Sequence, residues 1–431
     1  MEARQSKPRL IQAVIDAFNL PDLRGKILFT LAILILFRFI ANVPVPGVDS
    51  GKLAELFSGA GSEFMDILDL FSGGALRKAS IASLGVYPYI TASIIMQLLV
   101  PVIPRLQALA KEGDSGREKI NMYTHWLTVP LAALQGYGQM MLLHRSGIIE
   151  WSTLTVVTTV VSLVACTMLL VWLGERITER GIGNGISLII FGGIVVSMPQ
   201  TIWQAYDFGL GSLIRLILLS VAIITLIVFV TEAYRRIPVH YSRSVFHGRR
   251  MYRQSGSTYI PLRVNMAGMI PLIFGMALVS LPVTICAFFF PDNSVSKTIQ
   301  DVMAYDSWLY WLLFFFLVVG FAFFYTIVIF EQQNLAETLQ KQGGFIPGIR
   351  PGRHTAEYLD QVISRITWGG ALFLGGIAVM PFFSKWIAGV PDPTYMILGS
   401  AGALISVGVA LDTMRQLESQ LLMRRYEGFL K

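Results

Sequence analysis

The sequence predicts an all-α membrane protein with ten transmembrane helices, arranged as two five-helix halves of opposite orientation. Three observations predict this fold class: few charged residues, apolar runs long enough to cross a bilayer, and an uneven distribution of Lys and Arg between alternate connections. Hydrophobic residues make up 54% and charged residues 14% of the 431 residues, whereas about 25% of an ordinary soluble domain is charged. This composition argues against a soluble globule.

The apolar runs define the expected spans. A bilayer core of about 30 Å requires about 20 apolar residues in one helix. Three weaker runs contain one polar residue each, at 27–43 with Arg38, 120–143 with His125 and 208–231 with Arg215, and such side chains can reach an interface or face a protein interior. The seven runs without a charged residue lie at 79–104, 151–174, 181–206, 264–291, 307–330, 366–384 and 393–411.

The distribution of Lys and Arg sets the orientation of these spans. Alternate connections hold 26 of these residues on one side and 6 on the other, and short cytosolic loops are enriched in them. The amino tail, 1–26, and the carboxyl tail, 414–431, are therefore both expected in the cytosol. The external loop 200–212 divides the chain into halves 27–199 and 213–413. Each half has five spans, so the second half enters the membrane in the opposite sense.

The sequence contains no motif for catalysis or cofactor binding. It has no Walker sequence, no HExxH and no GxSxG, and GIGNG at 181–185 lacks the third Gly of a dinucleotide loop. The five His are scattered, and Cys166 and Cys286 lie in apolar runs without CxxC spacing. We therefore predict no enzyme, no cofactor and no metal site.

A multi-span solute transporter is the competing class. Ion-coupled carriers usually place ionisable side chains near the middle of the membrane, and no Asp or Glu falls inside any of the ten runs. This alternative is weakened but stays open, because unwound backbone carbonyls can also bind ions.

An amphipathic segment on the outer side, 63–79, is too short to cross the membrane. It gives about two helical turns before Gly73 and Gly74 break the pattern. A re-entrant half-helix fits, and non-helical backbone at membrane depth requires a protein-lined cavity, so we expect a central cavity. An interfacial helix is the alternative. The apolar residues of the segment are Phe64, Met65, Ile67, Leu68, Leu70 and Phe71.

Two cytosolic loops of the second half, 235–265 and 331–365, are longer than a minimal connection. The first holds seven Arg with interleaved Tyr and Phe. This suits ribosomal RNA or an acidic protein, although a positive-inside anchor would also explain the charge. The second presents Arg350 and Arg353 on a turn that contains two Pro. This turn predicts docking of a partner.

Seven strings, spread from the first external loop to the second cytosolic loop, carry a family resemblance as a set. They are FSGGALRKASI at 71–81, PYITASIIMQLL at 88–99, KEGDSGREKI at 111–120, ITERGIGNGIS at 177–187, RRIPVHY at 235–241, PLRVNMAGMIP at 261–271 and FIPGIRPG at 345–352. Together they resemble the SecY family of protein translocase channel subunits. The resemblance implies a channel for unfolded polypeptide in the bacterial cytoplasmic membrane, with its halves hinged at 200–212.

The resemblance also implies how the central pore is closed. The segment 64–74 would be a plug on the outer side, and five branched apolar residues would form a ring at the constriction. Such side chains form no fixed bonds to a passing chain and make a narrow pore costly to wet. Each ring residue alone is equally compatible with core or lipid packing. The ring positions are Val86, where relatives usually have Ile, and Ile90, Ile190, Ile273 and Ile405.

A lateral gate is a further implication, because in this family spans two and three part from spans seven and eight to let an apolar signal sequence reach lipid. Asn265 matches a polar gate position, and Thr91 and Gln97 of span two could face it. A hydrogen bond in this setting contributes about 0.6 to 2 kcal/mol, little enough for a signal helix to replace it. Helix-end capping by Asn265 and ordinary packing by the other two are the alternatives.

Energy must come from a partner, since no nucleotide motif is present. The resemblance implies the SecA ATPase or a translating ribosome on the cytosolic loops, together with the small subunits SecE and SecG. An unfolded precursor, its signal sequence and membrane lipid would be the other contacts. The expected docking residues are Arg350 and Arg353 in one loop and Arg243, Arg249 and Arg250 in the other.

Overall fold

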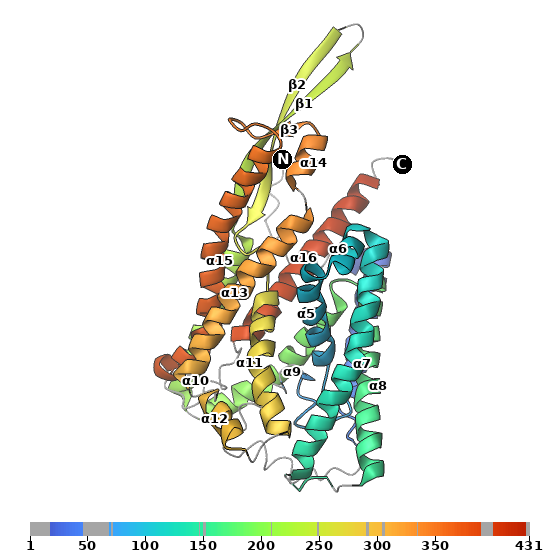
Figure 1. The fold of residues 1–431 in the computed structure, drawn as a ribbon, viewed down its shortest axis with the longest axis vertical. Helices are drawn as coiled ribbons and strands as arrows, with labels where there is room; N and C mark the ends of the chain where they lie inside the picture. Colours follow the sequence, from blue (N-terminus) through green and yellow to red (C-terminus); the bar gives the residue numbers. More distant parts are fainter. Residues whose placement is uncertain are drawn as a thin grey trace.

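The computed structural model describes residues 18–45, 69, 72–145, 147–149, 152–207, 209–247, 250–289, 293–303, 307–333, 335–388 and 400–427. In these ranges the chain is mostly helical, and the long helices run along the long axis of the molecule (Figure 1). A β-hairpin projects from one end. The predicted helical fold class is confirmed, with a small sheet in addition.

The long helices of the first half coincide with its five predicted spans. α2 and α5 have a Pro at the start, where a missing backbone N–H breaks no helical bond. The short α6 (Pro104–Lys111) follows α5 at a bend of 98°, because Ile103 precedes a Pro and is extended. The five long helices are α2 (Pro21–Ile40), α5 (Tyr87–Val102), α7 (Asp114–Arg145), α8 (Thr153–Arg180) and α9 (Gly185–Asp207).

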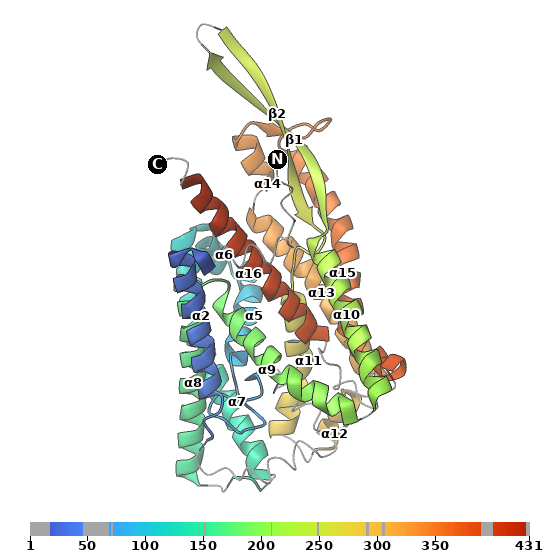
Figure 2. The same ribbon diagram turned by 180° about the vertical axis from the view of Figure 1, so that it is seen from behind.

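The second half likewise has a long helix at each predicted span. Two short helices, α12 (Ser294–Val302) and α14 (Leu335–Lys341), lie between them. The halves meet where α7 packs against α11 and where α9 packs against α16, and Figure 2 shows α9 and α16 from that side. The long helices are α10 (Leu210–Glu232), α11 (Ile270–Phe289), α13 (Trp308–Gln333), α15 (Arg353–Ala388) and α16 (Ser400–Glu427).

Three helix boundaries differ from the predicted spans. α5 begins at Tyr87 rather than at residue 79, since residues 72–86 form mainly turns. α15 already begins at Arg353, within the predicted cytosolic loop, and α16 continues to Glu427, through most of the predicted carboxyl tail. The added turns are rich in Arg, Glu, Gln and Leu, which form helices readily outside a membrane too.

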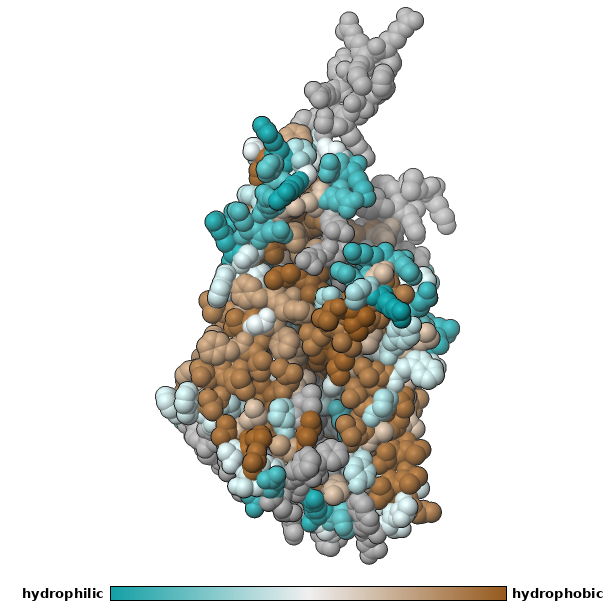
Figure 3. Space-filling model, in the orientation of Figure 1, coloured by the Kyte–Doolittle hydropathy of each residue, from teal (hydrophilic) through white to brown (hydrophobic). Residues whose placement is uncertain are grey.

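Among the described helices, four are long and apolar enough to cross a membrane by length and composition: α8, α10, Trp308–Val328 of α13 and Arg353–Ser384 of α15. The bent pair of α5 and α6 makes a fifth if it counts as one span. Hydrophobic side chains form a broad zone across the middle of the molecule in Figure 3. The chain is a multi-pass membrane protein, and the number of ten crossings stays a prediction.

The predicted cytosolic loop 235–265 is a β-hairpin rather than an irregular loop. β1 (Tyr234–His247) pairs with β2 (Arg250–Arg263) in antiparallel register, with Tyr234 opposite Arg263. β3 (Gly344–Phe345), from the second cytosolic loop, pairs with the other edge of β1. No strand was predicted in either connection, and pairing over about 100 residues of sequence joins the two in one sheet.

Of the five hydrophobic clusters among the described residues, two position the helices and the sheet. The larger contains side chains from every long helix except α7 and so runs through both halves. The smaller lies under the sheet, where Ile237 and Val239 of β1 and Leu262 of β2 pack with Ile346 and with Leu359 of α15. The sheet is therefore held against α15 of the second half by apolar burial, in addition to the hydrogen bonds between its own strands.

Candidate pore, gate and docking surface

The five residues predicted to form the pore ring come from four separate helical regions. Val86 caps α5 and Ile90 is one turn inside it, whereas Ile190, Ile273 and Ile405 lie on α9, α11 and α16. Each is at most 9% exposed, and all five belong to the larger hydrophobic cluster. Branched apolar side chains offer no hydrogen-bonding groups to water, so a pore lined by these residues would be costly to wet.

The predicted plug residues Phe64, Met65, Ile67, Leu68, Leu70 and Phe71 lie outside the described residues. The structure does describe the glycines that follow them. Gly73 and Gly74 have φ values of +67° and +82°, a conformation that Gly adopts far more readily than other residues. The expected break in the helical pattern is therefore present at these two positions.

The three predicted gate residues are buried or half-buried, and each donates its hydrogen bond within its own segment. The Thr91 hydroxyl donates to the Tyr87 carbonyl at 3.1 Å. The Gln97 amide donates to Ser93 Oγ at 3.2 Å, and the Asn265 amide donates to the Gly268 carbonyl at 3.2 Å. Asn265 thus stabilises the turn before α11, as the capping alternative expected.

Two of these gate residues also carry an acceptor without a partner. Gln97 Oε1 and Asn265 Oδ1 are buried and accept no hydrogen bond from the described part of the chain. An unsatisfied buried acceptor costs about 1 to 3 kcal/mol. Since α7 and α11 pack against each other, the first and second halves are in contact on the side where the gate is predicted.

The predicted docking turn has one free and one paired arginine. Both Arg350 and Arg353 are exposed. Arg353 forms an ion pair with Glu357, with Nε at 3.0 Å from Oε1, whereas Arg350 has no ion pair with any described residue. The turn itself is held by buried Ile346 and by a hydrogen bond of 2.9 Å from the Thr355 hydroxyl to the Arg350 carbonyl. A fixed backbone therefore presents a free guanidinium.

The hairpin places the other predicted docking residues beyond its base. Arg243 lies opposite Gln254 and Arg250 lies opposite His247 in the strand register, while Arg249 is outside the described residues. Arg243 and Arg250 thus lie on the two hairpin strands, whereas Arg353 begins α15 and Arg350 lies in the turn before it.

An aromatic arginine site at the base of the hairpin was not predicted from the sequence. The Arg236 guanidinium lies 5.1 Å from the Tyr234 ring centre and 4.9 Å from that of Tyr259. It also donates to the Tyr234 hydroxyl at 2.6 Å, and this hydrogen bond raises the pKa of Arg236. The alternation of exposed Tyr234 and Arg236 with buried Ile237 and Val239 was a usable strand signal.

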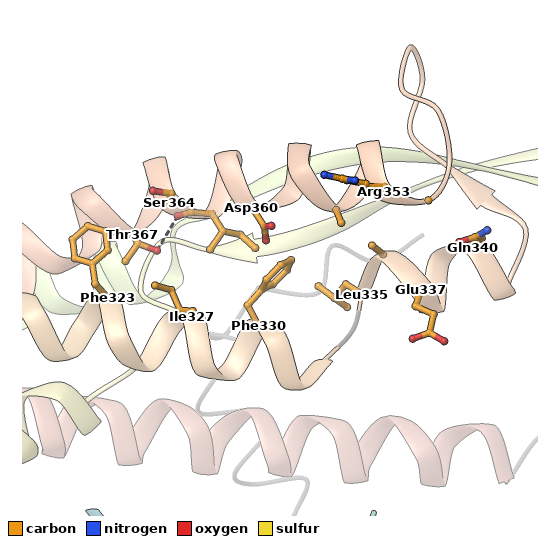
Figure 4. Close-up of a pocket in the computed structure, with 14 residues that line it drawn as sticks. Phe323, Ile327, Phe330, Leu335, Glu337, Gln340, Arg353, Asp360, Ser364 and Thr367 are labelled. Atoms are coloured by element: carbon orange, nitrogen blue, oxygen red, sulfur yellow. Dashed lines mark hydrogen bonds between the residues drawn. The ribbon is translucent and has the colours of Figure 1, made fainter. Parts of the chain in front are cut away.

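A cleft of about 600 Å³ lies between α13, α14 and α15, next to the docking turn (Figure 4). Phe323, Ile327 and Phe330 of α13 line it on one side, and α14 and α15 contribute polar side chains that include Gln340, Arg353 and Thr367. No motif in the sequence indicated this cleft, because its residues come from three elements. Elsewhere, no group of three or more metal-binding side chains occurs among the described residues.

The comparison with known families agrees with this geometry. The family model described as SecY matches residues 80–414. The chain belongs to the SecY family. Its similarity to curated members covers almost the whole length: it is 42% identical to the protein translocase subunit SecY of Streptomyces lividans, covering 98% of this chain and 100% of that one. Identity to the SecY subunit of Thermotoga maritima is also 42%, covering 97% and 98%.

Solved structures show the same SecY fold. A structure described as that of a protein conducting channel matches with a TM-score of 0.63 at 17% identity, covering 94% of this chain and 96% of that one. A SecY structure, described as one whose plug domain stabilises the closed state of the translocation channel, has a TM-score of 0.62 at 16% identity, with the same coverage. Sec61 from a canine ribosome-channel complex has a TM-score of 0.60 at 17% identity and again covers 94% and 96%.

Proposed function

We infer that this chain is the channel subunit of a protein translocase. It passes unfolded polypeptide across the membrane and releases apolar helices sideways into lipid. The observation that carries this inference is the near-full-length match to the SecY family. The burial of all five proposed ring residues in one cluster that contains side chains of both halves supports it. An apolar constriction suits a cargo whose side chains vary along its length, because it offers no fixed partner to any of them.

The ring acts as an apolar seal in this proposal. In the resting channel Val86, Ile90, Ile190, Ile273 and Ile405 exclude water from one another. When a polypeptide enters, these side chains change rotamer around it without losing hydrogen bonds, since they make none. The segment 64–74 is proposed as a plug on the outer side, by analogy with the plug domain that stabilises the closed state of the related SecY channel.

Sideways release occurs between α7 and α11. Gln97 Oε1 on α5 and Asn265 Oδ1 just before α11 are buried acceptors without a described partner, so a passing helix with a polar side chain could satisfy either. Interhelical hydrogen bonds of about 0.6 to 2 kcal/mol hold such a contact without locking it. The external loop 200–212 is proposed as the hinge about which the halves 27–199 and 213–413 move.

The partner binds at the cytosolic end. Free, exposed Arg350 on a fixed turn suits a carboxylate or phosphate of a motor or ribosome, and Arg353, Arg243, Arg249 and Arg250 extend the basic surface. We propose SecA or a ribosome as the partner, with SecE and SecG as further subunits. Both tails, 1–26 and 414–431, are then cytosolic, and the membrane is the bacterial cytoplasmic membrane.

Reconstitution tests this proposal. The chain is purified with SecE into liposomes, supplied with SecA, ATP and an unfolded precursor that carries a signal sequence, and assayed for precursor protected from protease. We expect protection with the parent chain and roughly a tenfold or greater loss with Arg350→Glu. Lys341→Glu is the charge-matched control, since Lys341 lies nearby on α14 and is paired with Glu337.

The outcomes separate the alternatives. Protection by the parent chain that is lost only with Arg350→Glu supports both the channel and its docking turn. Equal protection by both variants would exclude Arg350 from docking while keeping the channel. If SecA fails to bind the parent chain at all, the docking proposal fails and uptake of small solutes by the same liposomes becomes the next assay.

A further inference from the structure

Residues 72–86 link the glycine turn to the pore ring, and the structure fixes them firmly to the end of α2. They end at Val86, the first ring position. The Ile81 amide donates to the Val43 carbonyl at 3.0 Å, and the Val45 amide donates to the Ala79 carbonyl at 2.8 Å. The buried Ser80 hydroxyl donates to the Ile40 carbonyl at 3.0 Å. Val86 therefore follows a segment that α2 holds in place.

The side chain of Asp69 stabilises the first turn of this segment. One oxygen of its buried carboxylate accepts the amides of Leu76 at 3.0 Å and Arg77 at 3.1 Å. The other lies 3.2 Å from Arg77 Nε. Backbone amides and a guanidinium together satisfy a carboxylate that would otherwise be costly to bury, and they compact the turn that contains Gly73 and Gly74.

Arg38 joins this turn to α2 from within a predicted span. Its Nη1 donates to the Gly73 carbonyl at 2.9 Å. A charged side chain inside a membrane helix is expensive and is found mainly where it has a structural or functional partner. The carbonyl of the glycine turn is such a partner, and this explains why the apolar run 27–43 tolerates one arginine.

Gly193 makes the second contact with the same turn. A Cβ placed on Gly193 would lie 2.5 Å from Gly73 Cα, and a Cβ placed on Gly73 would lie 2.7 Å from Gly193 Cα. The two backbones therefore touch, and neither position has room for a methyl group. Gly193 lies on α9 three residues after the ring residue Ile190, so the two are neighbours on one face of the helix.

We propose that Arg38 and Gly193 are positioning residues for the pore ring. They clamp the turn at Gly73 between α2 and α9, and this sets the separation of Val86, at the end of residues 72–86, from Ile190 on α9. The proposal rests on the proposed channel function and on the ring. A methyl group at Gly193 would push the two backbones apart and open a gap in the apolar seal through which water and ions pass.

The test compares two adjacent glycines. Gly192→Ala is the matched control for Gly193→Ala, because a Cβ on Gly192 meets only Leu34 Cδ2, at 3.4 Å. The measurement is ion leak through the channel reconstituted with SecE, without precursor, together with the translocation assay. We expect Gly193→Ala to raise the leak roughly tenfold and Gly192→Ala to leave it at the parent level.

Arg38 provides the second arm. Arg38→Met removes the donor and should raise the leak to a similar extent, whereas Arg38→Lys keeps a donor and should restore most of the seal. A role limited to folding would lower protein yield and thermal stability without this rescue. If Gly193→Ala does not accumulate, the ion leak of the parent chain, Arg38→Met and Arg38→Lys tests the positioning role instead.

Failure of this inference differs from failure of the channel proposal. If the parent chain translocates precursor but Gly193→Ala and Arg38→Met leak no more than the parent, the positioning role is wrong and the channel stands. If the parent chain translocates nothing while a leak still distinguishes Gly193→Ala from Gly192→Ala, the clamp stands and the channel proposal fails.

Discussion

The proposed pore ring and the proposed docking turn differ in the kind of side chain that each presents. The proposed ring consists of branched apolar residues that are distant in sequence and buried in one large hydrophobic cluster. The docking turn uses neighbouring residues, exposes its arginines and fixes its backbone through Ile346 and Thr355. The contrast teaches that a passage for varied cargo avoids directed bonds, whereas a binding surface for one partner requires them.

The largest expected effect is a loss of stability that is confined to the hairpin and the docking turn. Ile237→Ala removes a buried side chain under the sheet and should destabilise the hairpin and docking turn by about 2 to 5 kcal/mol. Hydrogen exchange of the β1 amides should rise and SecA binding should fall, with ion leak unchanged. Ile237→Val should cost only about 0.5 to 1.5 kcal/mol. A raised leak in Ile237→Ala would mean that the regions are coupled.

A polar substitution in the ring should break the seal but spare docking. Ile190→Asn places an amide among buried apolar side chains, and water must enter to satisfy it. We expect the leak of the resting channel to rise on the order of tenfold to a hundredfold, with SecA affinity unchanged. Ile190→Val keeps the surface apolar and should leave the leak near the parent value. A dry channel in Ile190→Asn would contradict the ring assignment.

Binding of SecA to the proposed docking turn should depend on the charge at residue 350. Arg350→Ala removes the free guanidinium, and we expect about a tenfold loss of SecA affinity that becomes smaller as salt is raised. Arg350→Lys should recover part of the affinity, because Lys retains the charge but not the bidentate geometry. Equal affinity of all three proteins at low salt would remove Arg350 from the interface.

The smallest effect concerns a surface pair beside the docking turn. Lys341 donates a hydrogen bond to Glu337 and lowers the pKa of Glu337. The folded-state pKa is depressed, so the pair stabilises the fold above the ordinary carboxylate pKa and this contribution disappears as pH falls through the lowered value. Because the pair is exposed, Lys341→Ala should barely change thermal unfolding at neutral pH. A large change would show that α14 depends on this pair.

The long apolar helices were predictable because two local requirements define them. The side chains of such a run must be apolar to lie in lipid, and its backbone groups must form their hydrogen bonds within the same helix. The bend after α5 was likewise encoded locally, by a Pro at residue 104. The hairpin was not predicted, since Arg and Ser are frequent in the segment and, where the structure describes burial, Ile237, Val239 and Leu262 carry the alternation of a buried face. Their burial depends on α15 and on Ile346, which lie about 100 residues away.

The sequence by itself determined the membrane class, the positions of the ten helical runs and, through its family resemblance, the candidate ring. Only the tertiary structure decided which side chains meet. Nothing near Arg38 in the chain indicates its hydrogen bond to Gly73, and no local pattern indicates that Gly193 touches Gly73. The physical reason is the distance along the sequence over which each interaction acts. Helix formation and partition into the membrane depend on neighbouring residues. The contacts at Gly73 and the pairing of β1 with β3 form only after segments distant in the sequence pack together.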